Sequence, residues 1–170
     1  GSGVVVKIGP GVKKVKPKDK VVLHWIKGSG HQSDTPEYYS GKKKINAGWV
    51  TTFNEIAVVS ENRLTKIKSK YSLKKAALFG CCATTSLSLV FNKLKLDKSD
   101  KVLIVGAGGL GQVIIQGAKL FNVNSLSAVD INNNALKKAK KFGVNLIYNF
   151  SNKKDKKKLN KLRFNKIVVT

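Results

Sequence analysis

The sequence KVLIVGAGGLGQ contains three glycines, Gly106, Gly108 and Gly111, at the spacing G-x-G-x-x-G. Between a strand and a helix, this spacing is typical of a turn that holds the pyrophosphate of a dinucleotide. Gly106 permits the tight turn, Gly108 leaves room for the phosphates, and Gly111 allows the helix to pack closely on the strand. Gly109 and Leu110 complete the first helical turn, whose free N–H groups would face the anion.

An acidic residue, Asp130, ends the next apolar segment, SLSAVD, about 20 positions beyond the glycines. Its carboxylate could accept hydrogen bonds from both ribose hydroxyls of the adenosine, and it would repel a 2′-phosphate, which favours NAD over NADP. Two alternatives stay open at this point. Asp130 could be a plain helix N-cap, and the glycine turn could bind nothing or another nucleotide.

The only two cysteines, Cys81 and Cys82, are adjacent in the segment LFGCCATTSLSLV. Vicinal cysteines rarely pair with each other, and no others exist to form a disulfide framework. This favours a reducing, cytoplasmic setting. Taken by itself, Cys81 could be either a metal ligand or a small buried apolar side chain.

Strands and helices that would position these residues alternate in the C-terminal part of the chain. The pattern predicts strands at 101–105, 125–130, 145–150 and 166–170, helices at about 110–121 and 132–142, and a solvated helix face or loop over 152–163. Such alternation indicates βαβ units and a parallel sheet. Earlier in the chain we expect strands at 3–9, in 15–25, at 53–60 and at 64–67, a long loop over 27–46, and helices over 72–79 and 81–94. We place the boundary between an all-β domain, 1–70, and an α/β domain, 71–170.

The composition is strongly basic, with a formal net charge of +24. That charge raises the alternative of a non-enzymatic, basic nucleic-acid-binding module. Only Arg63 and Arg163 are arginines, however, and the lysines are spread along the chain, which makes nucleic acid an unlikely partner. No apolar run is long enough to cross a membrane. Because the sequence contains no methionine, we interpret it as part of a longer protein.

These features together resemble the zinc-type medium-chain alcohol dehydrogenases. The resemblance rests on GSGVVVKIGPGVKKVKPKDKVVL, VTTFNEIAVVSENRLTKI, LFGCCATTSLSLVFN and VGAGGLG, and so extends over nearly the whole chain. It implies an α/β fold: part of a GroES-like β domain followed by part of a doubly wound parallel sheet of Rossmann type. It also implies NAD- and zinc-dependent oxidation of an alcohol or polyol to an aldehyde or ketone, or the reverse.

The resemblance also assigns individual residues. Cys81 matches the third protein ligand of the catalytic zinc, and Thr85 matches the threonine packed against the nicotinamide. Cys82 and Ser86 stand where the family usually or often has glycine. The other two zinc ligands would lie before residue 1, so these residues alone would be inactive. The cysteines of a structural zinc are missing, and we expect no structural zinc.

Two further expectations follow from the family. The complete protein would be a cytoplasmic homodimer or homotetramer that acts on a small alcohol or carbonyl substrate. The alternative within the same superfamily is a zinc-free quinone or enoyl reductase that uses NADPH. Asp130 and Cys81 both argue against that alternative.

Overall fold

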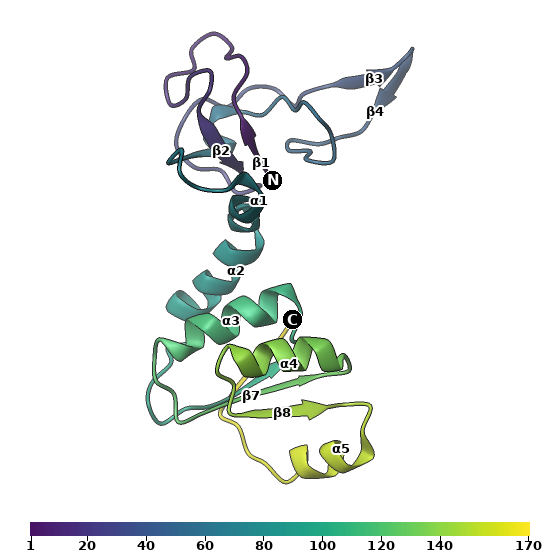
Figure 1. Ribbon diagram of the computed structural model, residues 1–170. Coiled ribbons are helices and arrows are strands. Elements are labelled where there is room, and N and C mark those ends of the chain that lie inside the picture. Colours follow the sequence, from purple (N-terminus) through teal and green to yellow (C-terminus); the bar gives the residue numbers. More distant parts are fainter. The chain divides into compact units, whose positions relative to one another are not determined.

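The computed structural model describes residues 1–170 in full and divides into two units, Gly1–Cys81 and Cys82–Thr170 (Figure 1). We call them the N-terminal and the C-terminal unit and describe each by itself. The domain boundary after residue 70 stays a prediction. No helix in the structure is long and apolar enough to cross a membrane.

The N-terminal unit is built on a three-stranded antiparallel sheet in the order β1–β2–β5. Strand β2 (Lys20–Leu23) lies between β1 (Ser2–Val4) and β5 (Leu64–Ile67). The strand predicted at 64–67 is confirmed, whereas the one predicted at 3–9 is limited to its first residues. The buried core of this unit is aliphatic and consists of Val15, Val21, Leu23 and Leu64.

A buried carboxylate ties the loops of this unit together. Glu61 begins a short 3₁₀ turn that ends at Arg63. Its carboxylate accepts hydrogen bonds from the backbone N–H groups of His31, Lys14 and Lys13. These hydrogen bonds lower the pKa of Glu61 to about 2, because each of them stabilises the charged form. Two loops remote from each other in sequence are therefore fixed to the start of β5.

The segment 27–46, expected to be a loop, contains a β-hairpin, so that expectation is wrong for its second half. Strand β3 (Tyr38–Ser40) pairs with β4 (Lys43–Ile45) around a two-residue turn that begins at Gly41, whose φ is +58°. A glycine with positive φ at the first turn position is typical of a tight hairpin. Gly41 was therefore a turn signal in the sequence, although the lysine-rich residues after it do not resemble a strand.

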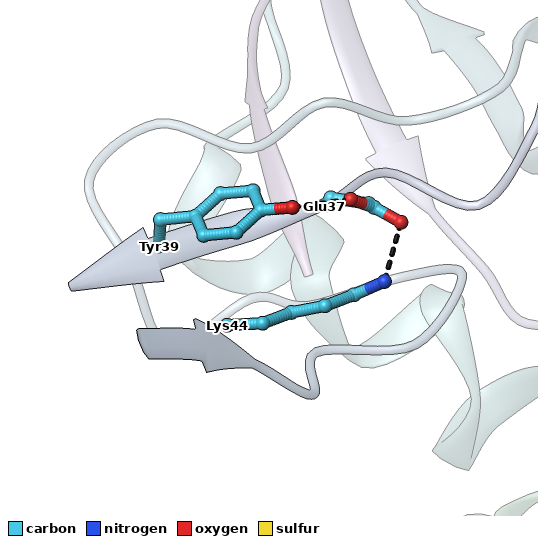
Figure 2. Close-up of polar contacts among 3 residues, drawn as sticks. All are labelled: Glu37, Tyr39 and Lys44. Atoms are coloured by element: carbon cyan, nitrogen blue, oxygen red, sulfur yellow. Dashed lines mark hydrogen bonds and ion pairs between the residues drawn. The ribbon is translucent and has the colours of Figure 1, made fainter. Parts of the chain in front are cut away.

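Figure 2 shows how the hairpin carries its polar side chains. The Glu37 carboxylate pairs with the Lys44 ammonium and accepts a hydrogen bond from the Tyr39 hydroxyl at 2.6 Å. This hydrogen bond raises the pKa of Tyr39, because the negative carboxylate opposes ionisation of the phenol. The side chains of the ion pair are half exposed, so we assign them a local role only.

The strand predicted at 53–60 does not form, despite its alternating pattern. Three of its apolar side chains, Phe53, Ile56 and Val58, are exposed, and no other strand pairs with the segment. Alternation alone therefore does not make a strand where no partner strand is available. Downstream, the helix predicted over 72–79 is reduced to α1 (Leu73–Ala76) and a following 3₁₀ turn (Ala77–Gly80).

The C-terminal unit contains a four-stranded sheet, all parallel, in the order β8–β7–β6–β9. Its elements are α2 (Cys82–Ser88), a π-helical turn (Leu89–Lys93), β6 (Lys101–Val105), α3 (Gly109–Lys119), β7 (Ser125–Asp130), α4 (Asn133–Lys141), β8 (Leu146–Asn149), α5 (Lys153–Leu159) and β9 (Lys166–Val169). The strands and helices predicted after residue 100 are confirmed, and with them the α/β class.

Helices cover both faces of this sheet, as Figure 1 shows. On one face, α3 and α4 pack on the strands through a core that includes Ile104, Ile114, Ile115, Leu126 and Leu136. On the other face, Leu159 of α5 packs with Phe164 against a smaller cluster on the strands. Such two-sided cover on parallel strands is the Rossmann arrangement, in which ligands bind at the carboxyl ends of the strands.

Candidate functional site

The predicted pyrophosphate turn lies at the carboxyl end of β6 and is too crowded for side chains at two of its three glycines. Gly106 has a φ of +98°, and a Cβ atom there would lie 2.5 Å from the Thr170 hydroxyl oxygen. A Cβ atom on Gly111 would lie only 2.0 Å from the Gly106 carbonyl oxygen. Both glycines are therefore required by the turn itself, one by its conformation and one by close packing of α3 on β6.

Gly108 differs from the other two because a Cβ atom there would meet nothing within 4 Å. Its backbone is extended rather than left-handed, with a φ of −73°. No contact within the protein requires glycine at this position, and the space beside the backbone is open. The first bond within the helix runs from the Gln112 N–H to the Gly108 carbonyl. The N–H groups of Gly109, Leu110 and Gly111 have no partner within the helix.

Asp130 ends β7 beside this turn, and its carboxylate is oriented by backbone groups. One oxygen, Oδ2, accepts a hydrogen bond from the Ala107 N–H at 2.7 Å, and Oδ1 accepts one from the Asn132 N–H at 2.8 Å. Partial burial by itself raises the pKa of Asp130. The N–H groups of Asn132, Ala107 and Ile131 outweigh burial, so the pKa lies below its usual value. Each oxygen keeps a further lone pair for a ligand hydroxyl.

The alternative reading of Asp130 as a helix N-cap is wrong. Asn132 is the N-cap of α4, and its side chain accepts hydrogen bonds from the N–H groups of Asn134 and Ala135. From β8, the Asn149 amide donates to the Ile131 carbonyl at 3.2 Å and to the Asn133 side chain at 2.6 Å. The start of α4 is therefore capped by Asn132 and not by the Asp130 carboxylate.

Two residues that hold the turn were not among the predicted site residues. The Gln112 amide donates to the Ala107 carbonyl at 2.7 Å and to the Ala135 carbonyl at 2.9 Å, which links the glycine turn to α4. The buried Ser86 hydroxyl donates to the Leu110 carbonyl at 3.2 Å, which links α2 to the first turn of α3. Only the second had a sequence signal, because Ser86 departs from the family's frequent glycine.

The cysteine segment is divided between the two units. Cys81 is exposed and ends the N-terminal unit. Cys82 begins α2, and its sulfur lies 3.7 Å from the place where a Cβ atom on Gly109 would be. Thr85 is an exposed residue of the same helix. The roles of Cys81 and Thr85 stay predictions.

No group of three or more His, Cys, Asp or Glu side chains in the structure could hold a metal ion. The residues present therefore do not by themselves fit a catalytic zinc. In contrast, the C-terminal unit brings three features together at the carboxyl ends of its strands. These are the open space at Gly108, the first N–H groups of α3, which have no partner within the helix, and the oriented carboxylate of Asp130. Such a set of groups could hold a dinucleotide.

Comparison with curated proteins finds dehydrogenases. An S-(hydroxymethyl)glutathione dehydrogenase of Photobacterium damsela subsp. piscicida is 30% identical over 169 residues, which cover 85% of this chain and 46% of that protein. The chain thus spans about half the length of the curated relatives it matches. No family model matches the sequence.

Solved structures give the same result. The galactitol-1-phosphate dehydrogenase of Escherichia coli is 26% identical, with a TM-score of 0.71 over 99% of this chain and 51% of that one. A zinc-dependent alcohol dehydrogenase 2 from Streptococcus pneumonia has a TM-score of 0.74 over 99% of this chain and 51% of its own. At 21% identity, the second similarity supports the fold alone.

Proposed function

We propose that the chain, which belongs to the zinc-type medium-chain alcohol dehydrogenase family, is part of an NAD-dependent enzyme that oxidises an alcohol or polyol. The observation that carries this proposal is the Asp130 carboxylate, oriented by the Ala107 N–H beside the glycine turn. When bound, NAD supplies the acceptor for a hydride from the alcohol carbon.

The chain's own residues would hold the two ends of the cofactor's adenosine diphosphate. The open backbone at Gly108 would admit the pyrophosphate, and the N–H groups of Gly109, Leu110 and Gly111 would donate to its oxygens. Asp130 would accept hydrogen bonds from the ribose hydroxyls. A 2′-phosphate would approach the same carboxylate, and repulsion between the two anions would select NAD over NADP. Thr85 would pack against the nicotinamide.

The zinc part of the proposal depends on Cys81 alone. We infer that its thiolate supplies one ligand of a catalytic zinc in the complete protein, with the remaining ligands from outside these residues. Zinc content measured on the complete protein should fall in Cys81→Ser and remain in Cys82→Ser. Equal zinc content in both variants would contradict this role for Cys81.

A cofactor titration tests the central claim. NAD binding measured by isothermal titration calorimetry should weaken about 10- to 100-fold in Asp130→Asn, the loss expected for one hydrogen bond to a charged group. The matched control is Asp97→Asn, because Asp97 lies in the loop that precedes β6, at the opposite end of that strand from the glycine turn. NAD affinity that is unchanged in Asp130→Asn, or tighter binding of NADP than of NAD to the unmodified chain, would refute the proposal.

Assembly and location are further proposals about the complete protein. We expect a homodimer or homotetramer in the cytoplasm, in keeping with the family and with two cysteines that form no disulfide. Light scattering on the complete protein checks the oligomeric state.

A further inference from the structure

The N-terminal unit contains a buried arginine that has no acidic partner. Arg63 is only 4% exposed. The two ion pairs of the structure, Lys44–Glu37 and Lys66–Asp19, do not involve it. Burying a guanidinium without an anion is costly, because the charge loses its hydration and gains no opposite charge. The position of this side chain therefore needs an explanation.

Two indole rings flank the guanidinium. Its central carbon lies 5.0 Å from the ring centroid of Trp25 and 5.2 Å from that of Trp49. The negative faces of aromatic rings attract a cation, and this attraction grows when water is excluded. The rings supply partial compensation for the charge, but they offer no oxygen to accept the guanidinium hydrogen bonds.

The donors of Arg63 are incompletely used. One nitrogen, Nη1, donates to the Trp25 carbonyl, whereas Nε is buried and has no hydrogen-bond partner. A buried, unpaired N–H on a cation is the group that a carboxylate or phosphate oxygen satisfies best, since such hydrogen bonds are charge-assisted. The unused donor therefore points to an oxyanion.

Hydrogen bonds fix the backbone of Arg63, whereas one of the two rings beside its guanidinium is exposed. The Arg63 N–H donates to the Ser60 carbonyl at 2.9 Å, and the Arg63 carbonyl accepts from the His24 N–H at 3.1 Å. The indole of Trp25, in contrast, is 60% exposed. Because Arg63 is nearly inaccessible, a ligand would reach Nε by displacing this exposed ring, so binding would change the surroundings of a tryptophan.

We propose that Arg63, Trp25 and Trp49 form a binding site for a small organic oxyanion, a phosphate monoester or a carboxylate. The anion pairs with the Arg63 Nε–H, and the Trp25 indole moves from the guanidinium to the body of the ligand. All three residues lie in the N-terminal unit, and the site requires neither NAD nor zinc. It thus shares no residue with the proposed dinucleotide site.

The chain provides its own reporter for this site, because its only two tryptophans are Trp25 and Trp49. Tryptophan fluorescence is followed while glycerol 3-phosphate, lactate or glycerol is added at constant ionic strength. We expect a saturable change with one or both anions and none with neutral glycerol. Saturation with the phosphate ester alone identifies a phosphate site, and saturation with lactate alone identifies a carboxylate site. No saturable change with either anion would overturn the proposal.

Two variants separate this site from general attraction to the many lysines. Arg63→Gln should weaken binding about 10- to 100-fold, and Arg63→Lys should restore part of the affinity because it keeps the charge but loses the planar fork. The matched control is Arg163→Gln, which removes the only other arginine, an exposed residue of the C-terminal unit. Circular dichroism confirms that each variant is folded. If Arg63→Gln does not fold, the comparison rests on Arg63→Lys. Equal affinities for the Arg63 and Arg163 variants would refute the site.

Discussion

Replacement of Gly111 by alanine should destabilise the C-terminal unit by about 2 kcal/mol or more. The new Cβ atom would lie 2.0 Å from the Gly106 carbonyl oxygen, whereas ordinary van der Waals contact begins near 3.4 Å. The neighbour is backbone and cannot rotate away, so the cost lies at the upper end of overpacking, about 3 kcal/mol or more. Alanine returns about 1 kcal/mol of helix propensity at this position of α3.

The loss should be measured by urea denaturation followed by far-ultraviolet circular dichroism, and by the thermal midpoint. For a unit of this size, 2 kcal/mol corresponds to a decrease of about 10 °C. The matched control is Gly108→Ala, where the added methyl group meets nothing within 4 Å. That variant should keep its stability to within about 0.5 kcal/mol but lose NAD affinity. If Gly111→Ala were as stable as Gly108→Ala, the reasoning about close packing at this turn would be refuted.

Three further predictions concern other parts of the chain. The pKa of Glu61 is lowered from 4.5 to about 2 in the folded protein, so the carboxylate stabilises the N-terminal unit fully above about pH 4.5 and loses this effect as the pH falls toward 2. Tryptophan fluorescence should therefore show an acid transition of the N-terminal unit that is weaker in Glu61→Gln. Asp100 is buried and accepts hydrogen bonds from Asn165 and the Asp97 N–H, so Asp100→Ala should cost about 2–3 kcal/mol in urea denaturation, and a loss below 0.5 kcal/mol would contradict this role. Glu37→Gln should change the free energy of unfolding by less than about 1 kcal/mol, because the ion pair of Glu37 with Lys44 is half exposed. In the same variant, a spectrophotometric titration should show a lower pKa of Tyr39, and an unchanged pKa would exclude the hydrogen bond between Tyr39 and Glu37 (Figure 2).

The C-terminal unit could be predicted from the sequence because its signals are local. Strand β6 is a short apolar run, α3 begins at the glycine turn, and the Asn132 side chain marks the start of α4. Parallel strands that are buried on both faces read as continuous apolar segments, and each is followed by a helix with its own periodicity. Agreement between these local patterns left few alternative topologies.

The N-terminal unit was harder to predict because its structure depends on contacts remote in sequence. The 53–60 segment alternates like a strand, but alternation cannot supply the partner strand that hydrogen bonding requires. The reverse error occurred at the hairpin of β3 and β4, where a polar, lysine-rich sequence concealed a good turn at Gly41. The hydrogen bonds to the Glu61 carboxylate and the contact of Arg63 with the Trp25 ring could not be predicted from the sequence either, since both join residues from separate loops.

The difference between local contacts and contacts remote in sequence also explains why the glycine turn is well defined in this chain and the predicted zinc site is not. Three residues outside the glycine motif orient the turn: Asp130 holds the Ala107 N–H, Gln112 joins that turn to α4, and Ser86 joins it to α2. All of these contacts lie within Cys82–Thr170, so one unit fixes the geometry that we propose to bind a dinucleotide. Substitutions at Gln112 or Ser86 should therefore weaken NAD binding although neither side chain is proposed to touch the cofactor. A zinc ion needs several ligands, and the structure contains no group of three or more His, Cys, Asp or Glu side chains that could supply them.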